Sequence, residues 1–200
     1  MNMETQATTP PQSPNTTETP GNLEPEELEQ LIRFYFRKGG DSRLKALMEE
    51  VNPDEYQASS RGVFALIPLL QLLREGNKAQ ARQLAASLQL NADISEPFRV
   101  YLRLLVNDPQ LPAKESIPGE HSFARNAEPP FTTLLLMEDG EISGDGHPNE
   151  ASWGLEDGHL VLYAEDKRPT SMLAYDNDRK CFIGPYLYDV SIHVLEPCNG

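Results

Sequence analysis

The stretch "GDGHPNEASWGLEDGHLVLY", residues 144–163, carries the strongest indication of the fold. Its tripeptide Glu156-Asp157-Gly158 separates two apolar runs, "ASWGL" and "HLVLY". Asp-Gly between apolar runs is a strong local signal for a β-hairpin, because a type I′ turn needs positive φ at both central residues. The stretch therefore predicts two antiparallel strands, with Trp153 at the start of the first strand and facing the core. We expect its acidic and imidazole side chains to point outward.

The same Glu-Asp-Gly tripeptide occurs at 138–140, and short apolar runs continue to the end of the chain. These runs are "FTTLLLM", "ASWGL", "HLVLYA", "TSMLAYD", "KCFIG" and "YDVSIHVLE". About six short strands joined by tight turns are typical of an antiparallel meander that curls into a small barrel. We predict this β-domain over residues 131–200.

Two segments on the N-terminal side lack any periodic pattern. Residues 109–130 contain five prolines, which predicts a Pro-rich linker. Residues 1–22 are rich in Thr and Pro and have Ala7 as their single aliphatic residue beyond two methionines. Such a segment buries too little apolar area to offset its ordering entropy, so we predict a disordered tail.

Residues 23–108 show the helical period, with apolar residues at i, i+3, i+4 and i+7. The five matching sets are Leu28/Leu31/Ile32/Tyr35, Leu44/Leu47/Met48/Val51, Leu66/Leu69/Leu70/Leu73, Ala81/Leu84/Ala85/Leu88 and Phe98/Tyr101/Leu102/Leu105. Short connections between amphipathic helices give antiparallel α-hairpins. The third helix is apolar nearly all round, which predicts the most buried one, and Pro68 either kinks or starts it. Together with the β-domain, this pattern predicts an α+β fold.

The segment "LLREGNKAQARQLAASLQLNAD", residues 72–93, resembles one tetratricopeptide-type (TPR-like) helical hairpin. The matching positions are Leu72, Leu73 and Gly76 at the end of the first helix and Ala81, Leu84 and Leu88 along the second. This resemblance implies stacked helical hairpins with a groove that docks a helix or strand of another chain.

The segment "EDGEISGDGHPNEASWGLEDGHLVLY", residues 138–163, resembles a small β-module at the ends of bacterial glycan-assembly and glycosyltransferase-type proteins. The matching residues are Gly140, Ile142, His147, Pro148, Asn149, Glu150, Trp153 and Gly158. The resemblance extends over residues 131–196 and implies a sugar-related context. It implies no catalytic role, and this chain has no accompanying transferase domain.

The net charge of −14 is concentrated in residues 113–200, which carry 6 basic and 16 acidic side chains. An acidic surface repels phosphate backbones, so we expect no direct nucleic-acid binding and favour a basic protein partner. No apolar run is long enough for a membrane helix, and the first residues lack a secretory signal. Cys181 and Cys198 are too few for a disulfide scaffold, which predicts a cytoplasmic protein.

The sequence shows no self-evident catalytic or metal motif. The four histidines lie at least 12 residues apart, which excludes the HxH and HxxxH spacings of metal sites. Asp145, His147 and Glu150 could meet in one loop, as an acid–base pair or a metal site, but a polar β-loop explains them more simply. Cys181 stands in an apolar strand pattern, which predicts an inert buried thiol. We therefore expect no cofactor and no metal.

Two groups of residues are candidates for binding. The first surrounds the 144–153 loop, where polar groups and a tyrosine could hold a sugar or a protein partner: Asp145, His147, Asn149, Glu150, Trp153 and Tyr163. The second flanks Gly39-Gly40 and could contact an anion or an acidic partner, although cations at a helix end explain it as well: Arg33, Arg37, Lys38 and Arg43.

The sequence therefore favours a non-catalytic binding or accessory protein that acts through protein–protein interaction. One alternative is a carbohydrate-binding or accessory module of bacterial polysaccharide assembly. A second alternative is an enzyme with its site in the 144–153 loop.

Overall fold

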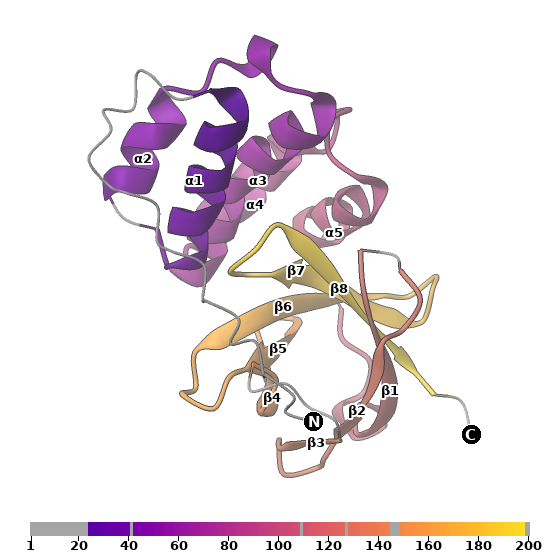
Figure 1. Ribbon diagram of the computed structural model, residues 1–200. Helices are drawn as coiled ribbons and strands as arrows, with labels where there is room; N and C mark the ends of the chain where they lie inside the picture. Colours follow the sequence, from indigo (N-terminus) through magenta and orange to yellow (C-terminus); the bar gives the residue numbers. More distant parts are fainter. Residues whose placement is uncertain (1–23, 41, 109, 127, 145–148, 199–200) are drawn as a thin grey trace, which may run out of the picture.

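The computed structural model describes residues 24–40, 42–108, 110–126, 128–144 and 149–198, and shows a helical N-terminal region above a β-sheet (Figure 1). Within these residues the helical elements are α1 (Pro25–Arg37), α2 (Ser42–Glu49), η2 (Pro53–Glu55), α3 (Ala58–Arg74), α4 (Lys78–Leu88), α5 (Glu96–Val106) and η3 (Lys114–Ser116). The predicted tail, residues 1–22, lies outside the described residues. The mixed α+β class and the antiparallel C-terminal β region are confirmed.

The helices begin and pack as their sequences indicate. α1 starts with a capping box between Glu24 and Glu27, and Pro25 occupies its first turn, where a missing N–H costs nothing. α3 carries the largest set of buried apolar residues, which confirms it as the most buried helix. Pro68 lies inside α3, so the helix does not start there. α4 packs against both α3 and α5.

The sheet has eight described strands: β1 (Gly119–Arg125), β2 (Thr132–Leu136), β3 (Ile142–Gly144), β4 (Ser152–Glu156), β5 (His159–Tyr163), β6 (Pro169–Asp176), β7 (Cys181–Tyr186) and β8 (Ser191–Pro197). Their order is β3-β2-β1-β8-β7-β6-β5-β4, and every paired neighbour is antiparallel. The edges approach through an isolated bridge between Glu141 and Ser152 and a bond from Trp153 N–H to Gly140 O of 2.7 Å. The sheet is therefore a nearly closed barrel.

Residues 119–125 differ from the sequence prediction. They were expected in a structureless linker, and instead form β1, which pairs with β2 on one side and β8 on the other. The five flanking prolines do not prevent this, because they all lie outside the strand. The β region thus begins before residue 131.

The two Asp-Gly turns differ in backbone conformation. Asp157 and Gly158 have φ values of 45° and 81°, as a type I′ turn requires. At 139–140, positive φ occurs at Gly140 alone, so that turn is of another type. Both hairpin positions are nevertheless confirmed.

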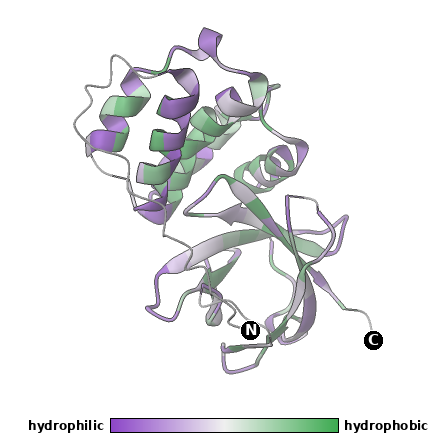
Figure 2. Cartoon of the chain, viewed as in Figure 1, coloured by the Kyte–Doolittle hydropathy of each residue, from purple (hydrophilic) through white to green (hydrophobic). Residues whose placement is uncertain are grey.

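The sheet separates two hydrophobic cores. Its inner face encloses a barrel core that includes Phe123, Trp153, Phe182 and Leu195. The outer face of β5–β8 joins the helices in a second core, where Val161, Met172, Ala174, Ile183 and Ile192 pack with helical residues. α5 contacts β6 and β7 directly, and hydrophobic residues concentrate on α3 and α5 near the sheet (Figure 2).

Candidate binding groove between α5 and the sheet

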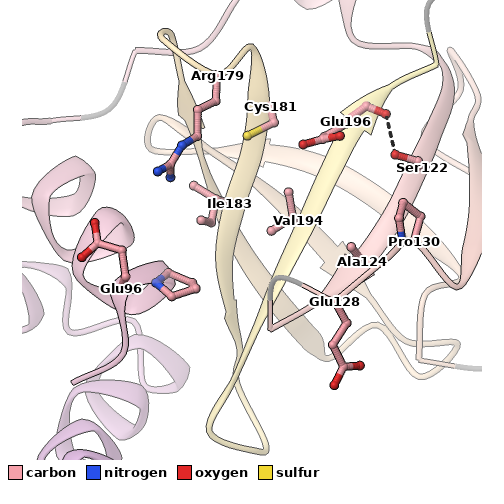
Figure 3. A pocket seen from close by; sticks show the side chains of 11 residues that line it. Glu96, Ser122, Ala124, Glu128, Pro130, Arg179, Cys181, Ile183, Val194 and Glu196 are labelled. Carbon is pink, nitrogen blue, oxygen red and sulfur yellow. Dashed lines mark hydrogen bonds between the residues drawn. The ribbon is translucent and has the colours of Figure 1, made fainter. Parts of the chain in front are cut away.

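A cavity of about 430 Å³ lies between the first turn of α5 and the outer face of β1, β7 and β8 (Figure 3). We call it the α5 groove. Glu96 and Pro97 form its helical wall, and residues 128–130 close another side. The start of β8 packs against the helices, whereas Val194 and Glu196 farther along β8 line the groove.

The floor of the α5 groove is apolar because of strand register. Ile183 on β7 pairs with Val194 on β8, which pairs in turn with Ala124 on β1. Directly paired residues of antiparallel strands share one face of a sheet, so these three side chains form one row. Cys181, two residues before Ile183, extends the floor.

The rim of the groove is predominantly acidic. Glu96, Glu128 and Glu196 are exposed there, against the single cation Arg179. Arg179 is itself 3.8 Å from the carboxylate of Asp176. Glu96 pairs with Arg99 on its own helix at 3.0 Å, which lowers its pKa. Within the described ranges, Glu128 and Glu196 form no ion pair, so their charges are available.

The floor residue Cys181 is a buried free thiol. Burial is the first cause that raises its pKa to about 11, and the carboxylates of Asp176 and Glu196 add to the effect, while Arg179 opposes it. A thiol with this pKa is protonated at neutral pH. The predicted burial of Cys181 is confirmed, and its raised pKa favours the predicted inert thiol.

The 144–153 loop is described only in part: Asp145 and His147 lie outside the described residues. Trp153 is buried, and its indole N–H donates to Met137 O at 2.9 Å, so the predicted core anchor is confirmed. The hydroxyl of Tyr163, which is half-buried, donates to Glu156. Asn149 Nδ2 donates to Tyr186 Oη at 3.3 Å.

The expectation that the acids and imidazoles of this stretch point outward is wrong for two residues. Glu150 is 6% exposed, and its burial raises the pKa of its carboxyl to about 7, while Arg125 opposes the shift. His159 is 1% exposed because it begins β5 on the strand face that packs toward the helices. Burial is the first cause that lowers its pKa.

The basic residues around Gly39-Gly40 contact groups of the same chain. Arg37 Nη2 lies 2.8 Å from Asp189 Oδ2 in the β7–β8 turn, and Arg33 is 4.0 Å from the same carboxylate. Lys38 lies over the Phe34 ring and Arg43 over the Tyr35 ring. These contacts join α1 to the sheet, and the prediction of an anion or acidic partner here stays a prediction.

The sequence reasoning did not find the α5 groove. Its walls come from residues 96–97, 122–130 and 179–196, which are far apart in the chain. The one sequence signal for the groove is the alternation of residues in the strands "CFIG" and "SIHVLE", because every second residue of a strand lies on the same face of the sheet. No group of three or more His, Cys, Asp or Glu suited to a metal ion occurs among the described residues. None of the described helices is long and apolar enough to cross a membrane.

Comparisons with known proteins add little. No family model matches the sequence, and no curated protein matches it. The crystal structure of a psychrophilic marine protease MP inhibitor aligns with 44% of this chain and 100% of that chain, at 14% identity and a TM-score of 0.37. That likeness is too low to carry an argument.

Proposed function

We propose that the protein is a non-catalytic binding protein that docks a basic segment of a partner protein in the α5 groove. The observation that carries this proposal is an apolar floor of Ala124, Ile183 and Val194 beneath an acidic rim. An aliphatic side chain of the partner would cover Val194, the partly exposed residue of this floor, at roughly 25 cal/mol per Å² of apolar surface buried. Flanking Lys or Arg residues would reach Glu128 and Glu196.

The chemistry of lysine and arginine suits such a groove. Their hydrocarbon stems pack along apolar surface while their charged ends stay at a polar rim. The net charge of −14 also raises the rate at which a basic partner approaches, through long-range attraction. A groove of about 430 Å³ holds one or two side chains, which suits a short linear segment rather than a folded domain.

Two finer parts of the sequence interpretation belong to this proposal. A TPR-like arrangement of α3 and α4 would serve as the scaffold that holds α5 beside the sheet. Both described cysteines are free thiols, Cys181 buried and Cys198 exposed, which supports a cytoplasmic location.

The experiment uses the full chain and three fluorescein-labelled peptides in a polarisation assay. One peptide alternates lysine and isoleucine, the second has glutamate for each lysine, and the third has serine for each isoleucine. We expect measurable binding of the lysine–isoleucine peptide alone, weakened by added salt. Equal binding of the glutamate peptide would contradict the proposal.

Rim variants locate the binding. Glu128→Lys with Glu196→Lys should weaken binding at least about tenfold, or ~1.4 kcal/mol. The matched control is Glu138→Lys with Glu165→Lys, which makes the same charge change at exposed positions away from the groove. If the control weakens binding as much as the rim variant, attraction is a property of the whole surface and the groove is not the site.

A further inference from the structure

A second cavity, of about 490 Å³, lies where the first turns of α4 meet the turn between β4 and β5. Lys78, Ala79 and Arg82 line it from α4, and Asp157 and Gly158 line it from the turn. We call it the α4 cavity. Four of its six lining residues are charged, so the cavity suits a small charged ligand.

The α4 cavity contains two cations and two carboxylates. Lys78 forms an ion pair with Asp157, which joins α4 to the β4–β5 turn. Arg82 forms an ion pair with Asp108, which follows the end of α5 and also lines the cavity. Both carboxylates are exposed, and ion pairs at an exposed surface are weak. These pairs can therefore open at little cost to admit a ligand.

Two buried polar atoms beside the cavity have no partner among the described residues: Arg82 Nε and His159 Nε2. His159 follows Gly158 directly, and its Nδ1 lies 3.0 Å from Asp157 O. Because a carbonyl oxygen only accepts, Nδ1 carries the hydrogen, and Nε2 of the neutral ring is an acceptor. The charged residues that act on this imidazole, Lys78, Arg82 and Asp157, all line the cavity. An unused donor and an unused acceptor thus flank one cavity.

The start of α4 adds further donors. The side chain of Asn77, which precedes the helix, does not cap it, and Asn77 Nδ2 donates instead to the Glu75 carboxylate at 3.0 Å. The N–H groups of the first turn therefore lack a side-chain acceptor from the capping residue. Ala79 belongs to this turn and lines the cavity, and the positive end of a helix favours a carboxylate.

We infer that the α4 cavity binds a small zwitterion, a molecule with one carboxylate and one ammonium group, such as a free amino acid. Its carboxylate would lie between Arg82 and the first turn of α4, because guanidinium and helix N–H groups both donate to carboxylates. Its ammonium group would lie between Asp157 and His159 Nε2, which both accept. The ligand would thus use the unpartnered donor and the unpartnered acceptor together.

Charge balance favours a zwitterion over a simple anion or cation. An anion would place its charge beside Asp108 and Asp157, in a chain whose net charge is already −14. A cation would meet Lys78 and Arg82 in the same way. A zwitterion leaves the cavity with equal numbers of positive and negative charges.

The test is independent of the proposed peptide binding, because the α4 cavity shares no lining residue with the α5 groove. The probes are serine, ethanolamine, which lacks the carboxylate of serine, and glycerate, which has a hydroxyl in place of the amine. Amide NMR spectra of the full chain measure affinity and location together. We expect serine to bind at least about tenfold more tightly than either other probe and to shift the Ala79 and Gly158 signals.

Asp157→Asn removes the charge that would meet the ammonium group. It should weaken serine binding at least about tenfold. The turn should keep its shape, since asparagine tolerates the positive φ of residue 157. Asp166→Asn in the β5–β6 turn is the matched control, because Asp166 also pairs with an arginine, Arg168 at 3.2 Å, and does not line the cavity.

Arg82→Met removes the cation that would meet the carboxylate and should also weaken serine binding at least about tenfold. Its control is Arg103→Met, since Arg103 on α5 also pairs with a carboxylate, that of Glu96 at 3.5 Å. Circular dichroism checks that each variant folds. No binding of serine, another probe bound as tightly, inorganic phosphate bound more tightly than serine, or an unchanged affinity in Asp157→Asn would each overturn the inference.

Discussion

The outer face of the sheet changes from fully buried to partly exposed along strand β8. Ile192 at the start of β8 is fully buried in the core shared with the helices, whereas Val194, two residues later on the same face, lines the α5 groove and is half-buried. Both are apolar β-branched residues with equal strand propensity. Their roles therefore depend on how completely the helices cover each residue, which no local property of the strand determines.

The two parts also differ in charge. The covered part packs apolar side chains of β5–β8 against apolar side chains of the helices. Around the α5 groove, Ile183 still belongs to the core shared with the helices, but its neighbour Val194 is half-buried, and exposed carboxylates surround it. The difference suggests that stability is concentrated in the covered part and binding in the uncovered part.

The largest expected effect tests how tightly β7 packs against β6 on the inner face of the sheet, opposite the covered part. A Cβ added at Gly184 on β7 would come within 2.0 Å of Met172 O on β6, a backbone atom that cannot move aside. We expect Gly184→Ala to lower the free energy of unfolding by about 4 kcal/mol or more. Gly154→Ala is the control, because its nearest neighbour, at 3.4 Å, is a ring atom of Tyr163. Urea unfolding of both variants measures the two losses of stability. Equal unfolding midpoints would show that β6 and β7 can move apart to fit the added methyl group.

The next effect compares the two β8 residues directly. Ile192→Ala should cost about 3 kcal/mol, since it removes buried methyl groups and leaves a cavity. Val194→Ala should cost less than about 1 kcal/mol, because the side chain is partly solvated. In the polarisation assay the order should reverse, with Val194→Ala weakening peptide binding more. Equal stability losses would remove the distinction between the covered and uncovered parts.

A third prediction concerns the inner face of the sheet, where His193 is fully buried. Burial, with Arg125 as a second cause, lowers the pKa of His193 to about 3. The folded protein keeps His193 neutral at pH 5, while the unfolded chain takes up a proton below pH 6.5. His193 therefore contributes a loss of about 2 kcal/mol of stability as the pH falls from 7 to 5.

His193→Gln tests this pH dependence, because glutamine can keep a hydrogen bond to Ser171 and does not titrate. The variant should lose less stability than the wild type between pH 7 and pH 5, whatever its stability at pH 7. Unfolding free energies at both pH values provide the measurement. An unchanged difference would mean that His193 does not set the acid sensitivity.

The smallest effect concerns how the helices stay over the sheet. Arg37 pairs with Asp189 in the β7–β8 turn, but its side chain is 58% exposed. Exposed ion pairs contribute between zero and about 1 kcal/mol, so Arg37→Ala should change the melting temperature little, and less at high salt. A loss above about 2 kcal/mol would indicate that ion pairs, and not the shared apolar core, hold the helices.

Sequence patterns predicted most of the elements because those elements have local causes. Apolar spacing identified the helices, and the Asp157-Gly158 turn has the predicted positive φ at both residues. Trp153 is a core residue, as its strand position indicated. β1 was missed because its sequence "GEHSFAR" is polar and lies among prolines, and its pairing with β8 joins residues about 70 positions apart.

The sites were harder to predict than the elements. The burial that raises the pKa of Glu150 comes from the folded chain around it, so this raised pKa has no local signal in the sequence. The α5 groove forms where the first turn of α5 meets β1, β7 and β8, which depends on tertiary packing and not on a local sequence pattern.

Amide hydrogen exchange of the full chain, with and without saturating lysine–isoleucine peptide, tests the central claim most directly. If the uncovered part of the outer face is the binding surface, exchange should slow at residues 122–130, at the first turn of α5 and at 194–196, and stay unchanged in α1 and α2. Slower exchange confined to α1 and α2, or no change at saturation, would contradict the account.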